Sequence, residues 1–191
     1  MKSFLFSLSI LLFSVASFAT GVEPSKKSIN VATSKIMWKG YKVTGSHDGT
    51  VNFKSGSLTF DNNKLTGGEL VVDVKSLAVT DLSGGGKDKL EGHLKSPDFF
   101  GVDTHPTAAI KFVKVASRGK EGEYRVTANI TIKNITKEIK FDANVANGVG
   151  TAAIKIDRSD FDIRYGSGSF FDSLGDKTIY DEFDLNVAIN F

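Results

Sequence analysis

Apolar side chains recur at every second position over long stretches of this chain, and this pattern constrains the fold more than any other feature. It runs through Tyr124–Lys133 and Ile139–Val145, and it returns at Ala152–Ile156 and Leu185–Phe191. Side chains of a β-strand point to opposite faces in turn, so each segment has one apolar face and one polar face. An α-helix would not gather these residues on a single side. The sequence therefore predicts an all-β domain.

Shorter stretches predict further strands and the turns between them. A glycine, Gly40, interrupts the alternation between Trp38 and Tyr41 and predicts a bulge. Only Lys87–Lys95 has helical spacing, with Leu90 and Leu94 four residues apart, and the glycines before it are expected to form a mobile lead-in. The remaining strands are expected at Lys35–Val43, Gly49–Lys54, Ser57–Asp61, Gly68–Val74 and Thr107–Ala116, with turns at Lys54–Gly56, Asp61–Asn63, Gly119–Gly122 and Asn147–Gly148.

Strands with one apolar face must bury that face against each other, in a sandwich or in a closed barrel. Periodicity does not choose between these two architectures. Closure removes exposed strand edges, and an eight-stranded barrel has an interior of the size needed for one small ligand. These two considerations favour the barrel.

The first residues have the features of a secretory signal peptide. Lys2 supplies a positive charge, Phe4–Phe18 is apolar, and small residues precede a cleavage site after Ala19. The alternative is a membrane anchor, but an apolar run of about 15 residues is short of the ~20 that span a bilayer. We therefore expect a signal peptide at residues 1–19 and one domain at 20–191, in a periplasmic or secreted protein without an integral membrane segment. The segment Thr20–Ser28 is expected to be a frayed end.

Charge and residue content argue against several classes of function. Loss of Lys2 lowers the formal net charge from +2 to +1, and acidic and basic residues are mixed, so we expect no nucleic-acid partner. Cysteine is absent, which leaves no disulfide, no lipid-attachment site and no thiol nucleophile. No Gly-x-Ser-x-Gly motif is present, and His47, His93 and His105 lack the spacing of a metal site. The expectation is a protein that is not an enzyme, with no catalytic residue, metal or cofactor.

The middle of the chain carries a more specific pattern. The run KDKLEGHLKSPDFFGV at residues 87–102 is followed by Thr104-His105-Pro106-Thr107, and it resembles the signature of the YceI-like family. Tyr124–Lys140 resembles a hairpin of that family, and Ile156–Ile163 resembles its Arg-x-Asp-Phe segment. Trp38-Lys39-Gly40 and His47-Asp48-Gly49 are similar to its opening. Gly101 and Asp162 depart from the usual residues, which leaves the ligand type less defined than the fold.

The resemblance implies a periplasmic or secreted, eight-stranded antiparallel lipocalin-like barrel with one short helix near one end. It also implies an elongated apolar cavity that holds a polyisoprenoid, a fatty acid or a fatty amide. The alternative from the residues alone is that the same side chains fill a closed core. If the cavity exists, the expected ligand-binding residues are Trp38, Phe53, Phe99, Phe100, Phe112, Ile130, Phe141, Ile154 and Phe171.

The sequence predicts specific roles for two aromatic pairs and for three polar residues. In an extended stretch, one of Phe99 and Phe100 would face inward, close one end of the barrel and touch the ligand. Phe171, with its neighbour Phe170 in a loop rich in glycine and serine, is expected to act as a lid or as a surface contact. Asp88, His93 and Arg158 are expected at the head-group end, because a phosphate or carboxylate head needs donors. An ion pair between Asp88 and Arg158 that fixes the helix to the barrel is the alternative, and the one we favour.

The sequence thus leaves two functions open. The first is a non-catalytic carrier of an isoprenoid or fatty amphiphile, as a monomer or as a homodimer. The second is an exported structural or interaction protein with a filled β-core and partner-binding loops.

Overall fold

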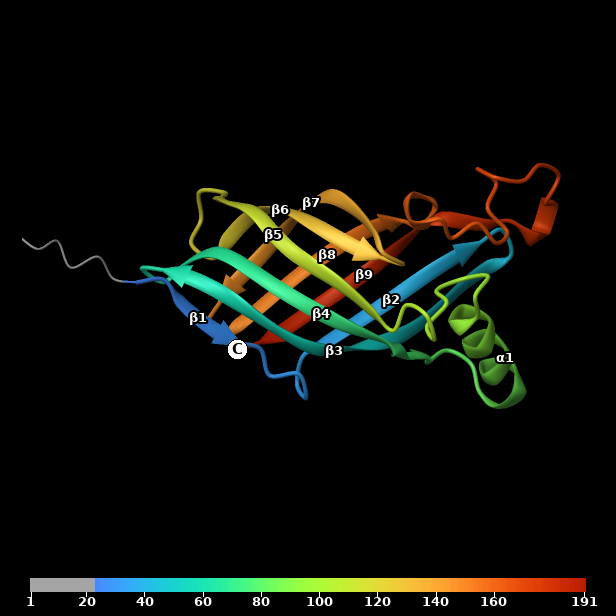
Figure 1. Cartoon of the computed structure of the whole chain (residues 1–191), viewed down its shortest axis with the longest axis horizontal. Helices are drawn as coiled ribbons and strands as arrows, with labels where there is room; N and C mark the ends of the chain where they lie inside the picture. Colours follow the sequence, from blue (N-terminus) through green and yellow to red (C-terminus); the bar gives the residue numbers. More distant parts are fainter. Residues whose placement is uncertain (1–22) are drawn as a thin grey trace, which may run out of the picture.

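A computed structural model of the chain describes residues 23–191, so the predicted signal peptide lies outside the described residues. Eight strands, β2 to β9, pair in an antiparallel ring that closes through β3 and β4 (Figure 1). The predicted closed barrel is confirmed. The elements are β1 (Ser25–Ser28), β2 (Lys35–Lys42), β3 (Gly45–Asp61), β4 (Lys64–Val79), α1 (Gly84–Lys95), β5 (Thr107–Ser117), β6 (Glu123–Ile132), β7 (Ile135–Ala146), β8 (Val149–Asp157), β9 (Ile179–Asn190) and two 3₁₀ turns, η1 (Arg158–Phe161) and η2 (Gly175–Lys177).

Alternation along the strands places the apolar residues inside the barrel. In β6, the residues Tyr124, Val126, Ala128, Ile130 and Ile132 are all buried, and those between them are more exposed. Tight turns join β3 to β4 and β7 to β8, where Asn62-Asn63 and Asn147-Gly148 have positive φ angles. Such turns match the twist of paired antiparallel strands. A third turn of this kind, Lys133-Asn134 between β6 and β7, contains no glycine, as is also the case for Asn62-Asn63.

Two features of the strands differ from the prediction. The expected turn at Lys54–Gly56 is instead a bulge within the single strand β3, whose register against β4 shifts between Phe53 and Ser55. Gly56 packs closely against β4 there, because an added Cβ would come within 2.5 Å of a terminal methyl group of Leu70, which would have to shift. The segment expected to be frayed contains β1, which pairs with the second half of β3. The bulge predicted at Gly40 is confirmed by a register shift between β2 and β9 at Gly40 and Lys42.

Different groups lie at the two ends of the barrel. At one end, the rings of Phe60 and Phe191 stack with centroids 5.3 Å apart, and the Lys27 ammonium group lies over both rings. At the other end lies α1, which begins three residues earlier than predicted because the expected mobile glycines form its first turn (Figure 1). The loop that contains η2 also lies at this end.

Candidate functional site

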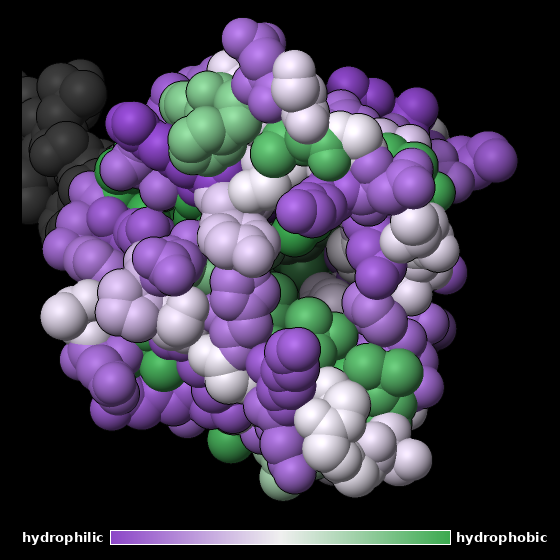
Figure 2. Space-filling model, turned by 90° about the vertical axis from the view of Figure 1, so that its right-hand side faces the viewer, coloured by the Kyte–Doolittle hydropathy of each residue, from purple (hydrophilic) through white to green (hydrophobic). Residues whose placement is uncertain are grey.

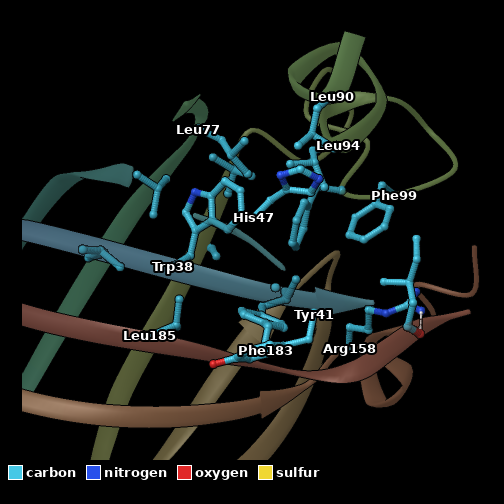
Figure 3. Close-up of a pocket in the computed structure, with 18 of the residues that line it drawn as sticks. Trp38, Tyr41, His47, Leu77, Leu90, Leu94, Phe99, Arg158, Phe183 and Leu185 are labelled. Atoms are coloured by element: carbon cyan, nitrogen blue, oxygen red, sulfur yellow. Dashed lines mark hydrogen bonds between the residues drawn. The ribbon is translucent and has the colours of Figure 1, made fainter. Parts of the chain in front are cut away.

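A cavity of about 310 Å³ lies inside the barrel next to α1. We call it the outer cavity. Its wall is formed mainly by apolar side chains of β2, β4, β6, β9 and α1, and the end face of the molecule is hollowed at this position (Figure 2). Trp38 and Leu185, which are paired across β2 and β9, point into it, and Leu90 and Leu94 approach from α1 (Figure 3). Burial of apolar surface is therefore the main interaction that the site offers.

A second, smaller space of about 90 Å³ lies deeper in the barrel, and we call it the inner cavity. Phe53, Phe112, Phe141 and Ile154 line it. The rings of Phe112 and Phe141 meet edge to face with centroids 6.0 Å apart. Aromatic side chains therefore fill much of the barrel on this side.

The structure distributes the predicted site residues over three locations. Phe171 is 50% exposed and lines neither cavity, and Asp88 is exposed on α1. Four of the predicted aromatic and aliphatic residues line the outer cavity, and one of these, Ile130, also lines the inner one. The residues at the outer cavity are Trp38, Phe99, Phe100, Ile130, His93 and Arg158; those at the inner cavity are Phe53, Phe112, Ile130, Phe141 and Ile154.

The segment that contains Phe99 and Phe100 is a turn and not an extended strand. The N–H of Phe99 donates to the Ser96 carbonyl and the N–H of Phe100 to the Leu94 carbonyl. Because the chain turns here, both rings reach the outer cavity, with centroids 5.2 Å apart. The prediction that one ring faces inward and the other outward is therefore wrong.

Arg158 is 2% exposed and lies beside the outer cavity, but each of its nitrogen atoms already has a partner. Nη1 donates to the Ile163 carbonyl at 2.8 Å, Nη2 to the Ile179 carbonyl at 3.0 Å and Nε to the Tyr180 carbonyl at 3.2 Å. Its ion-pair partner is Asp181, at 3.2 Å, and not Asp88 as the sequence had led us to expect. Burial lowers the pKa of Arg158, and the Asp181 charge opposes this shift. The guanidinium group fixes the segment between β8 and β9.

Among the residues predicted at the head-group end, His93 has a side-chain nitrogen without a hydrogen-bond partner. Its Nε2 is buried and has no hydrogen-bond partner among the described residues. The ring lies between Tyr165 and Phe99, at centroid distances of 4.3 Å and 5.7 Å. A ligand hydroxyl or carbonyl that reached this nitrogen would satisfy it.

Sequence reasoning missed several lining residues, and four of them carry polar side-chain atoms: Tyr41, Lys42, His47 and Tyr180. His47 lies on β3, and its Nδ1 is 2.9 Å from Asp81 Oδ2. The Tyr41 hydroxyl donates to Asp184 at 2.6 Å. The sequence carried no signal for either pairing, because the partners are far apart in the chain. Within residues 23–191, no group of three or more histidine, aspartate or glutamate side chains is placed to hold a metal ion.

Two carboxylates hold the cap, which we define as residues 81–100, onto the barrel. Glu91 Oε1 accepts a 2.8 Å hydrogen bond from the Val79 N–H, and this bond is the main reason why the pKa of Glu91 is lowered. Burial would raise the pKa of Asp81, but hydrogen bonds, first among them the one with His47, outweigh burial and lower it. Lys87 and Lys95 also face Glu91 and act in the same direction.

These lowered pKa values predict that the cap loosens in acid. A carboxylate with a depressed pKa in the folded state stabilises that state above its unfolded pKa, about 4 for Asp and Glu, and loses this effect as the pH falls further. We expect hydrogen-exchange protection of α1 to be constant from pH 8 to pH 5 and to fall about tenfold or more below pH 4. In the double variant Asp81→Asn/Glu91→Gln, protection should be low already at pH 7, whereas Asp88→Asn should behave as wild type. Unchanged protection of α1 at pH 3 would contradict this prediction.

Comparison with known proteins agrees with the architecture. Residues 22–191 match the model of the YceI-like domain. The chain belongs to the YceI-like family. Among its relatives, a UPF0312 protein of Pectobacterium carotovorum is 31% identical over 97 residues, 51% of this chain and 47% of the relative. A UPF0312 protein of Azotobacter vinelandii is 32% identical over 91 residues, 48% of this chain and 45% of the relative. The matched region thus spans about half the length of these curated relatives.

Solved structures share the YceI-like fold. Burkholderia cenocepacia BcnA superposes with a TM-score of 0.67 at 22% identity, covering 84% of this chain and 98% of BcnA. A polyisoprenoid binding domain from Saccharophagus degradans, implicated in plant cell wall breakdown, gives a TM-score of 0.57 at 15% identity, with 85% and 95% covered. At these identities the likeness establishes the barrel fold. No helix of the described residues is long and apolar enough to cross a membrane.

Proposed function

We propose that this chain is a non-catalytic binding protein that shields the hydrocarbon chain of an isoprenoid or fatty amphiphile inside its barrel. The observation that carries the proposal is the outer cavity, which is lined largely by apolar side chains and lies at a hollowed end of the molecule (Figure 2). The sequence also allowed a filled β-core as the alternative, and a filled core would leave no such space. The Saccharophagus domain of the same fold is a polyisoprenoid binding domain, which supports a ligand of this class.

The physical chemistry of the site supports binding without catalysis. Each buried methylene contributes about 0.8 kcal/mol, so ten would offer roughly 8 kcal/mol before the costs of ordering the ligand and the protein. Two polar groups at the cavity are tied to structural partners, His47 to Asp81 and Arg158 to three carbonyls, which leaves His93 Nε2, Lys42 and Tyr180 for the ligand's polar end. With the signal peptide expected at residues 1–19, we place the carrier in the periplasm or the medium.

Titration with decan-1-ol tests the proposal, because Trp38 is the single tryptophan of the chain and lines the outer cavity. We expect a saturable change in tryptophan fluorescence and one binding site by calorimetry, with a Kd in the micromolar range. The Trp38→Phe variant should lose the optical signal but keep the calorimetric one. Absence of saturable binding of decan-1-ol, of a prenol and of a fatty acid by calorimetry would reject the proposal.

A further inference from the structure

The exposed aromatic side chains of this barrel lie at one end of it. Four aromatic residues in the part of the chain that the structure describes are exposed, each to between 41% and 52%: Tyr165, Phe170, Phe171 and Tyr180. All four belong to the connection between β8 and β9 or to the start of β9, at the α1 end (Figure 1). Large apolar side chains exposed on the barrel wall, such as Met37 and Val113, are not aromatic.

These aromatic rings lie next to the mouth of the outer cavity. Tyr180 is exposed and also lines that cavity, and Tyr165 packs on the lining residue His93, with ring centroids 4.3 Å apart. Val43, which follows β2, adds an exposed aliphatic side chain beside them, because its N–H donates to the Thr178 carbonyl at 3.1 Å. Figure 2 shows apolar residues next to the hollow of this end face. We call the exposed set the rim; it consists of Val43, Tyr165, Phe170, Phe171 and Tyr180.

The two phenylalanine residues of the rim are carried by an anchored turn. The N–H groups of Phe170 and Phe171 both donate to the Ser167 carbonyl, at 3.2 Å and 3.0 Å. Ser167 is fully buried, and its hydroxyl donates to Asp181 Oδ2 at 2.9 Å. Asp181 is in turn paired with the buried Arg158. The backbone therefore holds both rings exposed, where their contact with water is unfavourable until a partner covers them.

The charges around the rim are balanced. Residues 42–46 and 162–178 together carry three basic and three acidic side chains, and residues 84–100, which contain α1, also carry three of each. Arg164 is paired with Asp162 and lies over the Phe170 ring, 4.9 Å from its centroid. A face with both signs and no net charge matches a layer of zwitterionic head groups, and it does not match an anionic surface.

We infer that the rim docks on the surface of a zwitterionic phospholipid bilayer. Aromatic side chains favour the boundary between head groups and acyl chains, where the ring is buried and a tyrosine hydroxyl stays hydrated. The inference rests on the proposed function, because a bilayer is the phase in which an isoprenoid or fatty amphiphile dissolves. Docking places the mouth of the outer cavity against that phase, so the hydrocarbon chain passes between the two without crossing water.

Flotation of the protein with phosphatidylcholine vesicles tests the inference. We expect the wild type to float with the vesicles equally at about 0.05 M and about 0.5 M salt, because balanced charges contribute little. The Phe170→Ser/Phe171→Ser variant should partition at least about tenfold more weakly, since the two rings no longer bury apolar surface. Its Kd for decan-1-ol should equal that of the wild type, because neither residue lines a cavity. Met37→Ser/Val113→Ser changes two similarly exposed side chains on the barrel wall and should partition as wild type.

A tryptophan placed in the rim locates the contact. In the Trp38→Phe background, vesicles with brominated acyl chains should quench the fluorescence of Phe171→Trp and not that of Met37→Trp. No association of the wild type with vesicles, or equal association of the folded Phe170→Ser/Phe171→Ser variant, would overturn the inference. A dimer of the wild type that this variant loses, seen by sedimentation without vesicle association, would overturn it in favour of an interface between two copies. Calorimetry with decan-1-ol judges the carrier function separately, because that function stands if the wild type binds the alcohol and docks on no vesicle.

Discussion

Replacement of Gly40 by phenylalanine is expected to weaken binding of decan-1-ol at least about 100-fold while the protein remains folded. Gly40 lines the outer cavity from β2, on the same face as Trp38, and a Cβ added there meets no atom within 4 Å. The new ring would enter the cavity without a backbone clash and take the place of three to four methylene groups. Their loss, at about 0.8 kcal/mol each, amounts to about two orders of magnitude in Kd.

The control for this variant is Gly92→Phe. Gly92 is exposed on α1, does not line the outer cavity, and also has nothing within 4 Å of an added Cβ. Calorimetric titration should give wild-type affinity for Gly92→Phe, and thermal unfolding should show that both variants are folded. Wild-type affinity in folded Gly40→Phe would mean that the ligand does not occupy the outer cavity.

The Arg158→Ala variant is expected to lose about 3–5 kcal/mol of unfolding free energy, as when one partner of a buried ion pair is removed. Arg158 is almost completely buried, and its loss would leave Asp181 without its counter-charge and the carbonyls of Ile163 and Ile179 without donors. Urea unfolding measures the change. The segment between β8 and β9 should lose its order first, because Asp181 also accepts hydrogen bonds from the hydroxyls of Ser167 and Ser169.

An exposed ion pair in the same region provides the comparison. Lys137 lies 3.0 Å from Asp160 of η1, but the two side chains are 44% and 52% exposed. Lys137→Ala should therefore cost less than about 1 kcal/mol. Arg158→Ala with wild-type stability and lost decan-1-ol binding would show instead that Arg158 contacts the ligand directly.

Local sequence patterns predicted most of the barrel because strand faces and tight turns depend on neighbouring residues. The alternation in Tyr124–Ile132 and the turns at Asn62-Asn63 and Asn147-Gly148 appear as expected. The turn expected at Lys54–Gly56 was wrong because β4 continues the hydrogen-bonded ladder across it, and a bulge absorbs the extra residue. Whether glycine marks a turn or a close contact depends on the partner strand, which the local sequence does not show.

The candidate site was harder to predict for the same reason. Trp38 and Ile130 line the outer cavity, but the inward face of each strand did not separate them from Phe53 and Phe141, which line the inner cavity. Arg158 was recognised, yet its partner is Asp181 across the β8–β9 connection and not Asp88 on the helix. Depth along the barrel and ion-pair partners follow from strand register and loop path, which involve residues distant in sequence.

The most direct test of the central claim is mass spectrometry of an organic extract of the protein purified without detergent, compared with a native spectrum of the intact protein. We expect one amphiphile with a hydrocarbon chain per protein molecule, present in the native spectrum, released on denaturation and absent from Gly40→Phe. A native spectrum of the bare chain, together with an extract free of such a species and no uptake of added alcohol, would contradict the claim that the barrel is a carrier.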